Sequence, residues 1–356
     1  MAKSQILAQS PNDVVIVSAL RTAITKAKKG GFKDTLPEEL LSNVLKAVYT
    51  SAKLDPKLIE DVAVGNVLPQ AEEPLQHIAN EISAGQIDIG IGAGVESMTH
   101  GYGAGVMPAQ FSEDVLANQE SADCLIPMGI TSENVAAQYK ISRATQDEFA
   151  AKSFAKAAAA LKAGKFRAEI VPVKTKWTDP KTSEVKEIVV ENDDGPAFSK
   201  TGSTHAGNAS QVSDGAAAVL LARRSVAQKL GLPILGKFVT SAVVGVPPKI
   251  MGVGPAFAIP KALSKAGIQL SDVDFFEINE AFASQAIMSI EHLGIPFEKV
   301  NPNGGAIALG HPLGCTGARQ VATAFAHAKR TNERIIVTSM CIGSGMGMAA
   351  VFVNEQ

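Results

Sequence analysis

Short apolar runs alternate with amphipathic stretches along most of the chain. The apolar runs are bounded by glycine, proline or polar residues, which is typical of buried strands. Strands that alternate with helices predict a layered α/β fold. The predicted strands are Val14–Val17, Val62–Val64, Ile87–Ile91, Ala217–Leu221, Phe275–Ile278, Ile335–Thr338 and Ala349–Val353, and the clearest helices are Glu38–Tyr49, Glu133–Tyr139 and Pro260–Ala266.

The middle of the chain departs from this alternation. Ala144–Ala163 is rich in alanine and lysine and predicts a helix that Gly164 ends. The polar stretch Lys174–Asp194 follows, with a predicted turn at Asp179–Thr182. We interpret this region as an insertion laid over the core.

A short internal repeat predicts a duplicated domain. Ile78–Ile82 leads through Gly85 into IDIGIGAGVESM, and Thr323–Lys329 leads through Asn332 into RIIVTSMCIGSGMG. Each copy therefore predicts a helix, a short turn, a strand and a glycine-rich turn. Similarity this short can also arise by coincidence.

The two copies differ in length. Glu60–Asn66 echoes Ser271–Asn279, and from this pair to the glycine-rich turn the first copy is about 36 residues shorter. The shortfall lies between Asn66 and His77. In the second copy this place holds GHPLGCTGAR, a glycine turn that leads into a helix. A helix N-terminus lowers the pKa of a cysteine and stabilises anions, so a turn of this kind is expected to be functional. The first copy has lost its counterpart.

Composition and charge exclude several classes of protein. The chain has 356 residues, 46% of them hydrophobic, and a net charge of −2, so no nucleic-acid partner is expected. No apolar window is long enough to span a membrane, and the N-terminus lacks a secretory signal. Cys124, Cys315 and Cys341 stand at unrelated spacings, so neither a disulfide framework nor a metal site is predicted.

The candidate chemistry lies near the C-terminus. His311 in GHP and Cys341 in CIGSG are each set among glycines, which let the backbone approach a ligand. An imidazole base together with an activatable thiol is typical of acyl transfer at a carbonyl carbon.

Several long motifs together carry a family resemblance. They are VVIVSALRTAI, GVESM, CLIPMGITSENVA, HAGNASQVSDGAA, GVGPAFAIP, FEINEAFASQA, NPNGGAIALGHPLGCTGARQVAT and SMCIGSGMGMAAVF. The chain resembles the thiolase family over nearly its whole length, and within it the degradative 3-ketoacyl-CoA thiolases of peroxisomal type. The resemblance implies a thiolase fold, in which two similar βαβαβαββ halves with five-stranded sheets pack as α/β/α/β/α layers with an inserted loop domain.

The resemblance also implies domain limits and biology. We expect an N-terminal half over 1–118 with a part missing between 66 and 77, a loop domain over 119–212, a return over 213–232 and a C-terminal half over 233–356. The implied reaction is cleavage of 3-ketoacyl-CoA by CoA in β-oxidation, with no cofactor beyond these substrates. Peroxisomal location and a homodimer are implied in the same way.

Site residues carry over from the matching motifs. His311 resembles the base that activates the nucleophile, and Cys341 the second cysteine, which donates and later accepts a proton. Asn279 is expected to hold an oxyanion-hole water, and the N–H of Gly343 to contribute to a second oxyanion hole. The expected substrate contacts are Ser210 and Ala206 on the pantetheine arm and Phe282 and Met128 as pocket walls.

One departure from the family is severe. Relatives begin a first-half helix with CSSG, whose cysteine becomes acylated, and the corresponding text here is NVLPQAEEPLQHIANEI. A second, shorter shortfall lies at DDGPAFSKTG. Either these 356 residues omit segments of the gene product, or the gene product lacks them. We favour omission, because losing a central helix would cost the first half much of its core.

Alternative functions follow from that departure. A genuine deletion predicts a catalytically dead, thiolase-fold acyl-CoA-binding protein, and a synthase of the same superfamily is a weaker rival.

Gly90–Gly94 resembles a dinucleotide fingerprint, but Val95 stands where its third glycine belongs, so NAD binding is not expected. His205 adjoins HAGNAS, where both a packing role and an approach to CoA stay open.

Overall fold

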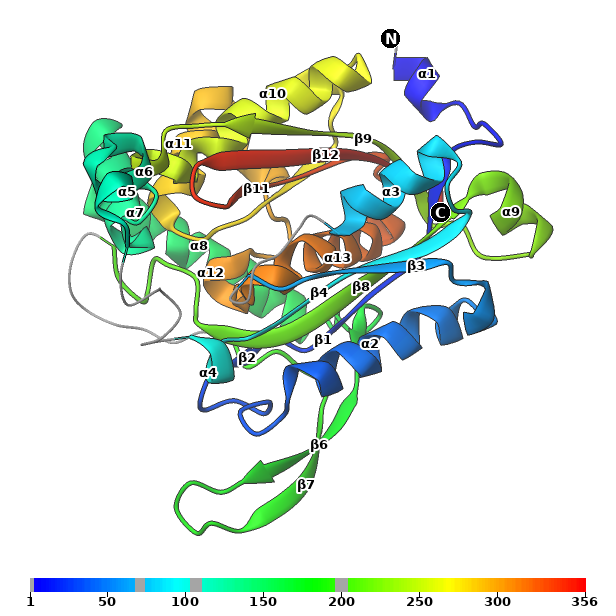
Figure 1. Cartoon of the computed structure of the whole chain (residues 1–356), viewed down its shortest axis with the longest axis horizontal. Helices are drawn as coiled ribbons and strands as arrows, with labels where there is room; N and C mark the ends of the chain where they lie inside the picture. The colour runs from blue at the N-terminus through cyan, green and yellow to red at the C-terminus, as the bar shows by residue number, and fades with distance from the viewer. Residues whose placement is uncertain (1–2, 68–73, 103–110, 196–203) are drawn as a thin grey trace.

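The first repeat supplies four strands of a large mixed sheet. The computed structural model describes residues 3–67, 74–102, 111–195 and 204–356 (Figure 1). Neighbouring strands follow the order β1, β8, β4, β3, with β3 and β4 parallel and the other pairs antiparallel. Their bounds are β1 Val14–Thr22, β3 Asp61–Gly65, β4 Ile89–Ser97 and β8 Ser213–Arg223.

The second repeat has the same strand order. It runs β9, β12, β11, β10, with β10 and β11 parallel and the other pairs antiparallel. The two sets join where β1 pairs with β9. Their bounds are β9 Gly236–Gly245, β10 Phe275–Ile278, β11 Ile335–Ile342 and β12 Met346–Asn354. The predicted duplication is therefore visible as one topology used twice.

Equivalent hydrogen bonds fix how the repeats correspond. Before β3, the N–H of Glu60 donates to the carbonyl of Ile89 at 2.9 Å, and the Glu60 carboxylate accepts the N–H of Ile89 at 3.0 Å. Before β10, Asp274 makes the same two bonds with Ile335, at 2.9 and 2.8 Å. Both acidic residues thus tie an edge strand to the start of its parallel neighbour.

These anchors correct the predicted correspondence. Counted from them, Asn279 is equivalent to Gly65 rather than to Asn66, and Gly343 is equivalent to Ser97. The comparison of the two sequence segments had matched residues of the same type, asparagine with asparagine and glycine with glycine. The strand register depends instead on backbone pairing, which single letters do not reveal.

The elements stack in five layers. Helix α2 covers the outer face of the first repeat's strands, and α10 and α11 lie outside the second repeat's strands, while α3 and α13 lie between the two sets (Figure 1). The predicted layered thiolase fold is therefore observed. The helix bounds are α1 Lys3–Leu7, α2 Pro37–Ser51, α3 Pro74–Ala84, α4 Met98–Gly101, α5 Glu113–Ala117, α6 Gln119–Asp123, α7 Met128–Gln138, α8 Arg143–Lys162, α9 Arg224–Lys229, α10 Gly254–Ala266, α11 Ala283–Leu293, α12 Ala306–Leu309 and α13 Thr316–Thr331.

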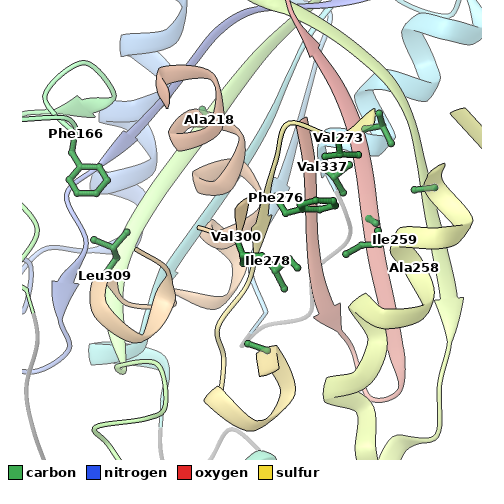
Figure 2. Packing of buried hydrophobic residues seen from close by; sticks show 14 of the residues in the cluster. Phe166, Ala218, Ala258, Ile259, Val273, Phe276, Ile278, Val300, Leu309 and Val337 are labelled. Carbon is green, nitrogen blue, oxygen red and sulfur yellow. The ribbon is translucent and has the colours of Figure 1, made fainter. Parts of the chain in front are cut away.

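Two apolar clusters hold the layers together. The inner cluster joins α3 and α13 to the facing sheets through residues such as Ile78, Ile82 and Phe325, all at most 1% exposed. The outer cluster includes Phe276 and Ile278 of β10, which lie beside Val300 and Val337 (Figure 2). Burial of this apolar surface is the main force that holds the halves together.

The central helix of the first half is present, which corrects our argument about deletion. Helix α3 places Ile78, Ala79 and Ile82 in the inner cluster with no exposed surface. It is the counterpart of α13, although it has 11 residues instead of 16. The shortfall therefore spares the inner core, and core loss is no argument against a genuine deletion.

The family's fifth strand is reduced here. In the second repeat it survives as a single bridge between Val300 and Phe276. No equivalent bridge occurs among the described residues of the first repeat, where the chain passes from β3 to α3 through residues 66–73. The resemblance implied five strands in each half, and the described residues form four main strands in each.

The middle region forms helices α7 and α8, which pack against α11 and α12 of the second half, and a hairpin beside the first half. The long helix α8 is observed as predicted, and β6 (Val173–Thr178) pairs with β7 (Val185–Val190). Between these strands the Asp179 carboxylate accepts the N–H groups of Lys181 and Thr182, which forms the predicted turn. Two short strands, β2 (Thr25–Lys26) and β5 (Ile170–Val171), add to the main sheet.

Six of the seven predicted strands fall within observed strands, Ile87–Ile91 begins two residues before β4, and β9 was missed. Its apolar residues are interrupted by Thr240 and Ser241, so it lacks a continuous apolar run. No helix in the described parts of the chain is long and apolar enough to cross a membrane.

Candidate active site

The candidate residues gather at the carboxyl edge of β10 and β11. Because these strands are parallel, the residues that follow them meet at one edge of the sheet. Asn279 directly follows β10, and its N–H donates to the carbonyl of Ser339 in β11 at 2.9 Å. Cys341 lies at the end of β11. The topology thus brings together two residues that are far apart in the sequence.

His311 is held in one tautomer by two neighbours. The Thr316 hydroxyl donates to the carbonyl of Pro312 at 3.1 Å, so its oxygen accepts the Nδ1–H of His311 at 2.6 Å. The amide nitrogen of Asn279 donates to Nε2 of His311 at 3.2 Å. Nε2 therefore carries a lone pair and no proton, as a general base requires.

The surroundings keep this imidazole uncharged. Burial and the positive charge of Arg319 lower the pKa of His311 to about 4. Asn279 itself is 1% exposed, and its Oδ1 is buried with no hydrogen-bond partner among the described residues. A buried acceptor without a partner is a place where an ordered water fits.

The turn before His311 depends on glycine. Gly310 has a φ of +108°, and a Cβ there would collide with the side chain of Ser213. The Ser213 hydroxyl in turn accepts the N–H of His311 at 3.2 Å. The start of β8 in the first half thus positions the base of the second half.

The GHPLG loop (residues 310–314), which carries His311, packs directly on the strands of the first half. A Cβ at Gly314 would lie 2.6 Å from the carbonyl oxygen of Gly65, and a Cβ at Gly94 would collide with the carbonyl of Gly314. One carboxylate oxygen of Glu96 accepts the N–H groups of Gly314 at 3.0 Å and Val67 at 2.9 Å. The carboxyl edge of β3 and β4 therefore serves as a platform for the GHPLG loop.

Cys341 is a part-buried, protonated thiol. Burial raises its pKa to about 11, so the thiol form dominates near neutral pH. Its Sγ lies 3.9 Å from Oε1 of Gln285 in α11. Two residues on, Gly343 has a φ of +57° and forms the turn between β11 and β12.

The other two cysteines lack the setting of a nucleophile. Cys124 is exposed at the end of α6. Cys315 has no exposed surface, and burial raises its pKa to about 12. Because Cys315 has neither solvent access nor a lowered pKa, it does not replace the cysteine of the CSSG motif.

Three of the four expected substrate contacts are near one another. Ser210 donates its N–H to the carbonyl of Ala281, and Ala209 bridges Phe282 as in an antiparallel pair. Ala206 is exposed on the same segment.

Met128 begins α7 and is 41% exposed. Helix α7 is tied to α11 by a 2.8 Å bond between the hydroxyls of Ser132 and Ser284.

His205 has a packing role. Its Nδ1 accepts the N–H of Gly207 at 2.8 Å, so its Nε2 carries the proton and donates to Asp147 at 2.9 Å. Because both ring nitrogens are used within the protein, His205 orders the HAGNAS segment and presents no free donor to a ligand.

One group of side chains could hold a metal ion in the described parts of the chain. The ligand atoms of Asp61, His77 and Glu81 lie within 4.8 Å of one another. His77 and Glu81 are one helical turn apart on α3 and form an ion pair at 3.5 Å. Sequence spacing did not reveal the group because Asp61 comes from β3.

Sequence reasoning missed three residues that shape the site. Thr316 fixes the tautomer of His311, Glu96 holds the GHPLG loop, and Gln285 contacts Cys341. Thr316 and Gln285 lie inside the motifs GHPLGCTGAR and NEAFASQ, so their neighbourhood was a usable signal. Glu96 lies inside the motif GVESM, but its contact with the GHPLG loop spans the two halves, so the motif did not reveal this partner.

Comparison with known protein families decides the identity of this arrangement. "Thiolase, N-terminal domain" matches residues 14–76 and 72–225, and "Thiolase, C-terminal domain" matches residues 232–354. The chain belongs to the thiolase family. The N-terminal match is divided in two pieces that meet where the sequence is short.

Individual thiolases are similar over almost the whole chain. The peroxisomal 3-ketoacyl-CoA thiolase of Yarrowia lipolytica is 53% identical over 98% of this chain and 95% of its own length. Thiolase B of Rattus norvegicus, also peroxisomal, is 54% identical over 96% of this chain and 91% of its own length. The alignment with the Yarrowia thiolase spans 395 positions, so that thiolase carries residues with no counterpart here.

Solved thiolase structures share the fold. The dimeric peroxisomal thiolase of Saccharomyces cerevisiae has a TM-score of 0.89 and 48% identity, covering 99% of this chain and 100% of its own. A second structure of the yeast peroxisomal 3-ketoacyl-CoA thiolase has a TM-score of 0.81 and 45% identity, covering 98% and 100%. It is described as five-layered and built from two core domains of identical topology, as observed here.

Proposed function

We propose that the protein is a peroxisomal 3-ketoacyl-CoA thiolase, an acetyl-CoA C-acyltransferase of fatty-acid β-oxidation. It cleaves 3-ketoacyl-CoA with CoA to acetyl-CoA and a shortened acyl-CoA. Peroxisomal relatives above 50% identity over nearly the full chain support this function. The observation that carries it is the unprotonated Nε2 of His311, fixed between Thr316 and Asn279.

His311 acts as the base in the first step. It takes the proton of the nucleophilic cysteine, whose thiolate then attacks the 3-keto carbon of the substrate. A water on the free Oδ1 of Asn279, together with the imidazolium, stabilises the negative charge on the substrate oxygen. Each such donor is worth on the order of 3 kcal/mol.

Cys341 moves the second proton. When the bond between the α and β carbons breaks, the acyl group stays on the nucleophile and the acetyl-CoA enolate takes the proton of the Cys341 thiol. The Cys341 thiolate then takes the proton of incoming CoA, whose thiolate releases the acyl group as acyl-CoA. The N–H of Gly343 contributes to the second oxyanion hole.

The expected binding contacts follow the same assignment. Ser210 and Ala206 face the pantetheine arm, and Phe282 and Met128 line the acyl pocket. The chemistry needs no cofactor beyond CoA as a substrate. The yeast relative is dimeric, and we propose a homodimer for this chain as well.

The nucleophile is absent from the 356 residues. The shortened connection between Asn66 and His77 is its place, since the counterpart of α13 begins there at Pro74. Residues 68–73 of this connection lie outside the described residues, as does most of the second shortfall. The thiolase reaction therefore depends on a cysteine supplied at the start of α3.

Two measurements on purified protein test this function. An intact mass of 37.0 kDa would identify the 356-residue chain, and a larger mass would reveal additional segments.

Incubation with a 3-ketoacyl-CoA, without CoA, should release acetyl-CoA and leave an acyl group on a cysteine. His311→Ala should abolish this labelling, while His292→Ala, which changes an exposed histidine, should not. A protein that binds acyl-CoA and forms neither product would be the acyl-CoA-binding protein instead.

A further inference from the structure

A buried amide beside Cys341 has no assigned task in the reaction. Gln285 in α11 has no exposed surface. Its Oε1 accepts a weak hydrogen bond from the Cys341 thiol at 3.9 Å. Its Nε2 is buried and has no hydrogen-bond partner among the described residues. Buried N–H donors are nearly always paired, so this one points to a group that it serves in another state of the site.

The base of this side chain is fixed while its end is free to turn. A Cβ at Gly252 would lie 2.7 Å from Cβ of Gln285, so α11 packs tightly against that backbone. The Ser289 hydroxyl donates to the backbone carbonyl of Gln285 at 2.9 Å. The terminal torsion of a glutamine is broad and roughly two-fold, so its oxygen and nitrogen exchange places without moving the rest of the residue.

We propose that Gln285 is a positioning residue whose carboxamide turns with the protonation state of Cys341. Oε1 accepts from the thiol, and after a half turn Nε2 donates to the thiolate from the same place. This rests on the proposed function, in which Cys341 alternates between the two forms. The turn breaks no hydrogen bond of Nε2, because Nε2 has none among the described residues.

The hydrogen bonds that the carboxamide makes with Cys341 in its two orientations differ in strength. A hydrogen bond from N–H to a thiolate is charge-assisted and stronger than one from a thiol to a carbonyl. The amide therefore favours the thiolate on balance. Cys341 needs such help because burial raises its pKa to about 11. A carboxamide neither gains nor loses a proton here, so it follows the proton transfer without competing for it.

Alkylation of Cys341 by iodoacetamide tests this without any turnover. Only the thiolate reacts, so at a pH well below its pKa the rate reports the thiolate fraction. We expect Gln285→Leu to slow alkylation about tenfold, as a rise of one pKa unit requires. Gln285→Glu should slow it further, because a carboxylate repels the thiolate. Peptide masses separate Cys341 from exposed Cys124, which serves as an internal reference.

Controls separate the proposal from a packing role. His292→Ala changes an exposed residue of α11, and it should leave the rate unchanged. Loss of packing alone would open the site and make Gln285→Leu react faster. An equal or faster rate in Gln285→Leu would therefore overturn the proposal. Gln285→Met gives the same comparison if the leucine variant does not fold. Failure of thiolase turnover would contradict the proposed function and leave this result standing.

Discussion

Equivalent residues of the two repeats differ in burial by a wide margin. Phe276 and Ile278 on the outer face of β10 are each 1% exposed, whereas their counterparts Val62 and Val64 on β3 are 41% and 39% exposed. Helix α11 and the Val300 bridge belong to the cover of the second repeat. Nothing equivalent occurs among the described residues of the first. The shortened connection has therefore removed outer cover from β3 and spared the inner core.

The carboxyl edges of the two repeats differ in the same way. The second edge carries Asn279 and Cys341, with His311 held beside Asn279. The first edge offers backbone and Glu96, which hold the GHPLG loop in place. One topology thus provides a chemical edge and a supporting edge, and only the second is complete in these 356 residues.

Restoring the missing segment at the carboxyl edge of the first repeat should produce the largest change in activity. We expect a graft of the corresponding segment of the Yarrowia thiolase between Val67 and Pro74 to raise acyl-enzyme formation on the order of 10³-fold or more. The physical reason is that a cysteine at a helix start supplies the missing nucleophile. Acyl adducts measured by intact mass give the readout.

A matched graft with serine in place of its cysteine is the control. Both grafts should also protect the amides of β3 from hydrogen exchange. A graft that protects β3 and still forms no adduct would show that the second edge is not the partner of this nucleophile.

Substitution on the outer faces measures the difference in cover. Phe276→Ala should lower the free energy of unfolding by about 3–5 kcal/mol, because it leaves a cavity under the outer layer. Val62→Ala, at the equivalent place, should cost less than about 1 kcal/mol, since nearly half of its side chain already meets solvent. Urea unfolding of both variants gives the comparison, and equal costs would contradict it.

The contact between the carboxyl edges of the two repeats can be disrupted by adding a single carbon atom. Gly94→Ala places a Cβ against the carbonyl of Gly314, and overpacking of this kind costs about 1–3 kcal/mol. Gly245→Ala is a matched control, because nothing lies within 4 Å of its added Cβ. Thermal unfolding should separate the two variants. If Gly94→Ala unfolded like the control, the platform role of the first edge would be wrong.

The weakest effect concerns the pH dependence of stability. The pKa of His311 falls from 6.5 to about 4 on folding, so the unfolded chain binds a proton in a range where the folded chain does not. Above pH 6.5 this group has no effect, and stability falls as the pH drops from 6.5 toward 4. The slope is at most about 1.4 kcal/mol per pH unit.

His311→Asn should flatten this fall, whereas His292→Asn should leave it unchanged. Unfolding free energies at several pH values between 4 and 7 provide the measurement. An unaltered slope in His311→Asn would mean that the imidazole is hydrated in the folded protein.

The sequence by itself determined the layered fold and the duplication, and it supplied the candidate residues for the chemistry. Apolar runs of strand length and helical spacing are local signals, so they survive in the text. Long motifs such as GHPLGCTGAR identified the family and placed His311 and Cys341. The missing first-half turn was also legible, because the two copies differ in length.

Only the tertiary structure decided how these pieces meet. The repeat register depends on the paired bonds of Glu60 and Asp274, and the text alignment placed Asn279 one position off. The tautomer of His311 and the burial of Gln285 depend on neighbours that come from distant segments. The repeat predicted a helix over Ile78–Ile82, but it did not reveal that this helix fills the inner core. Such facts arise from contacts between residues far apart in the chain, and a one-dimensional pattern does not encode distance.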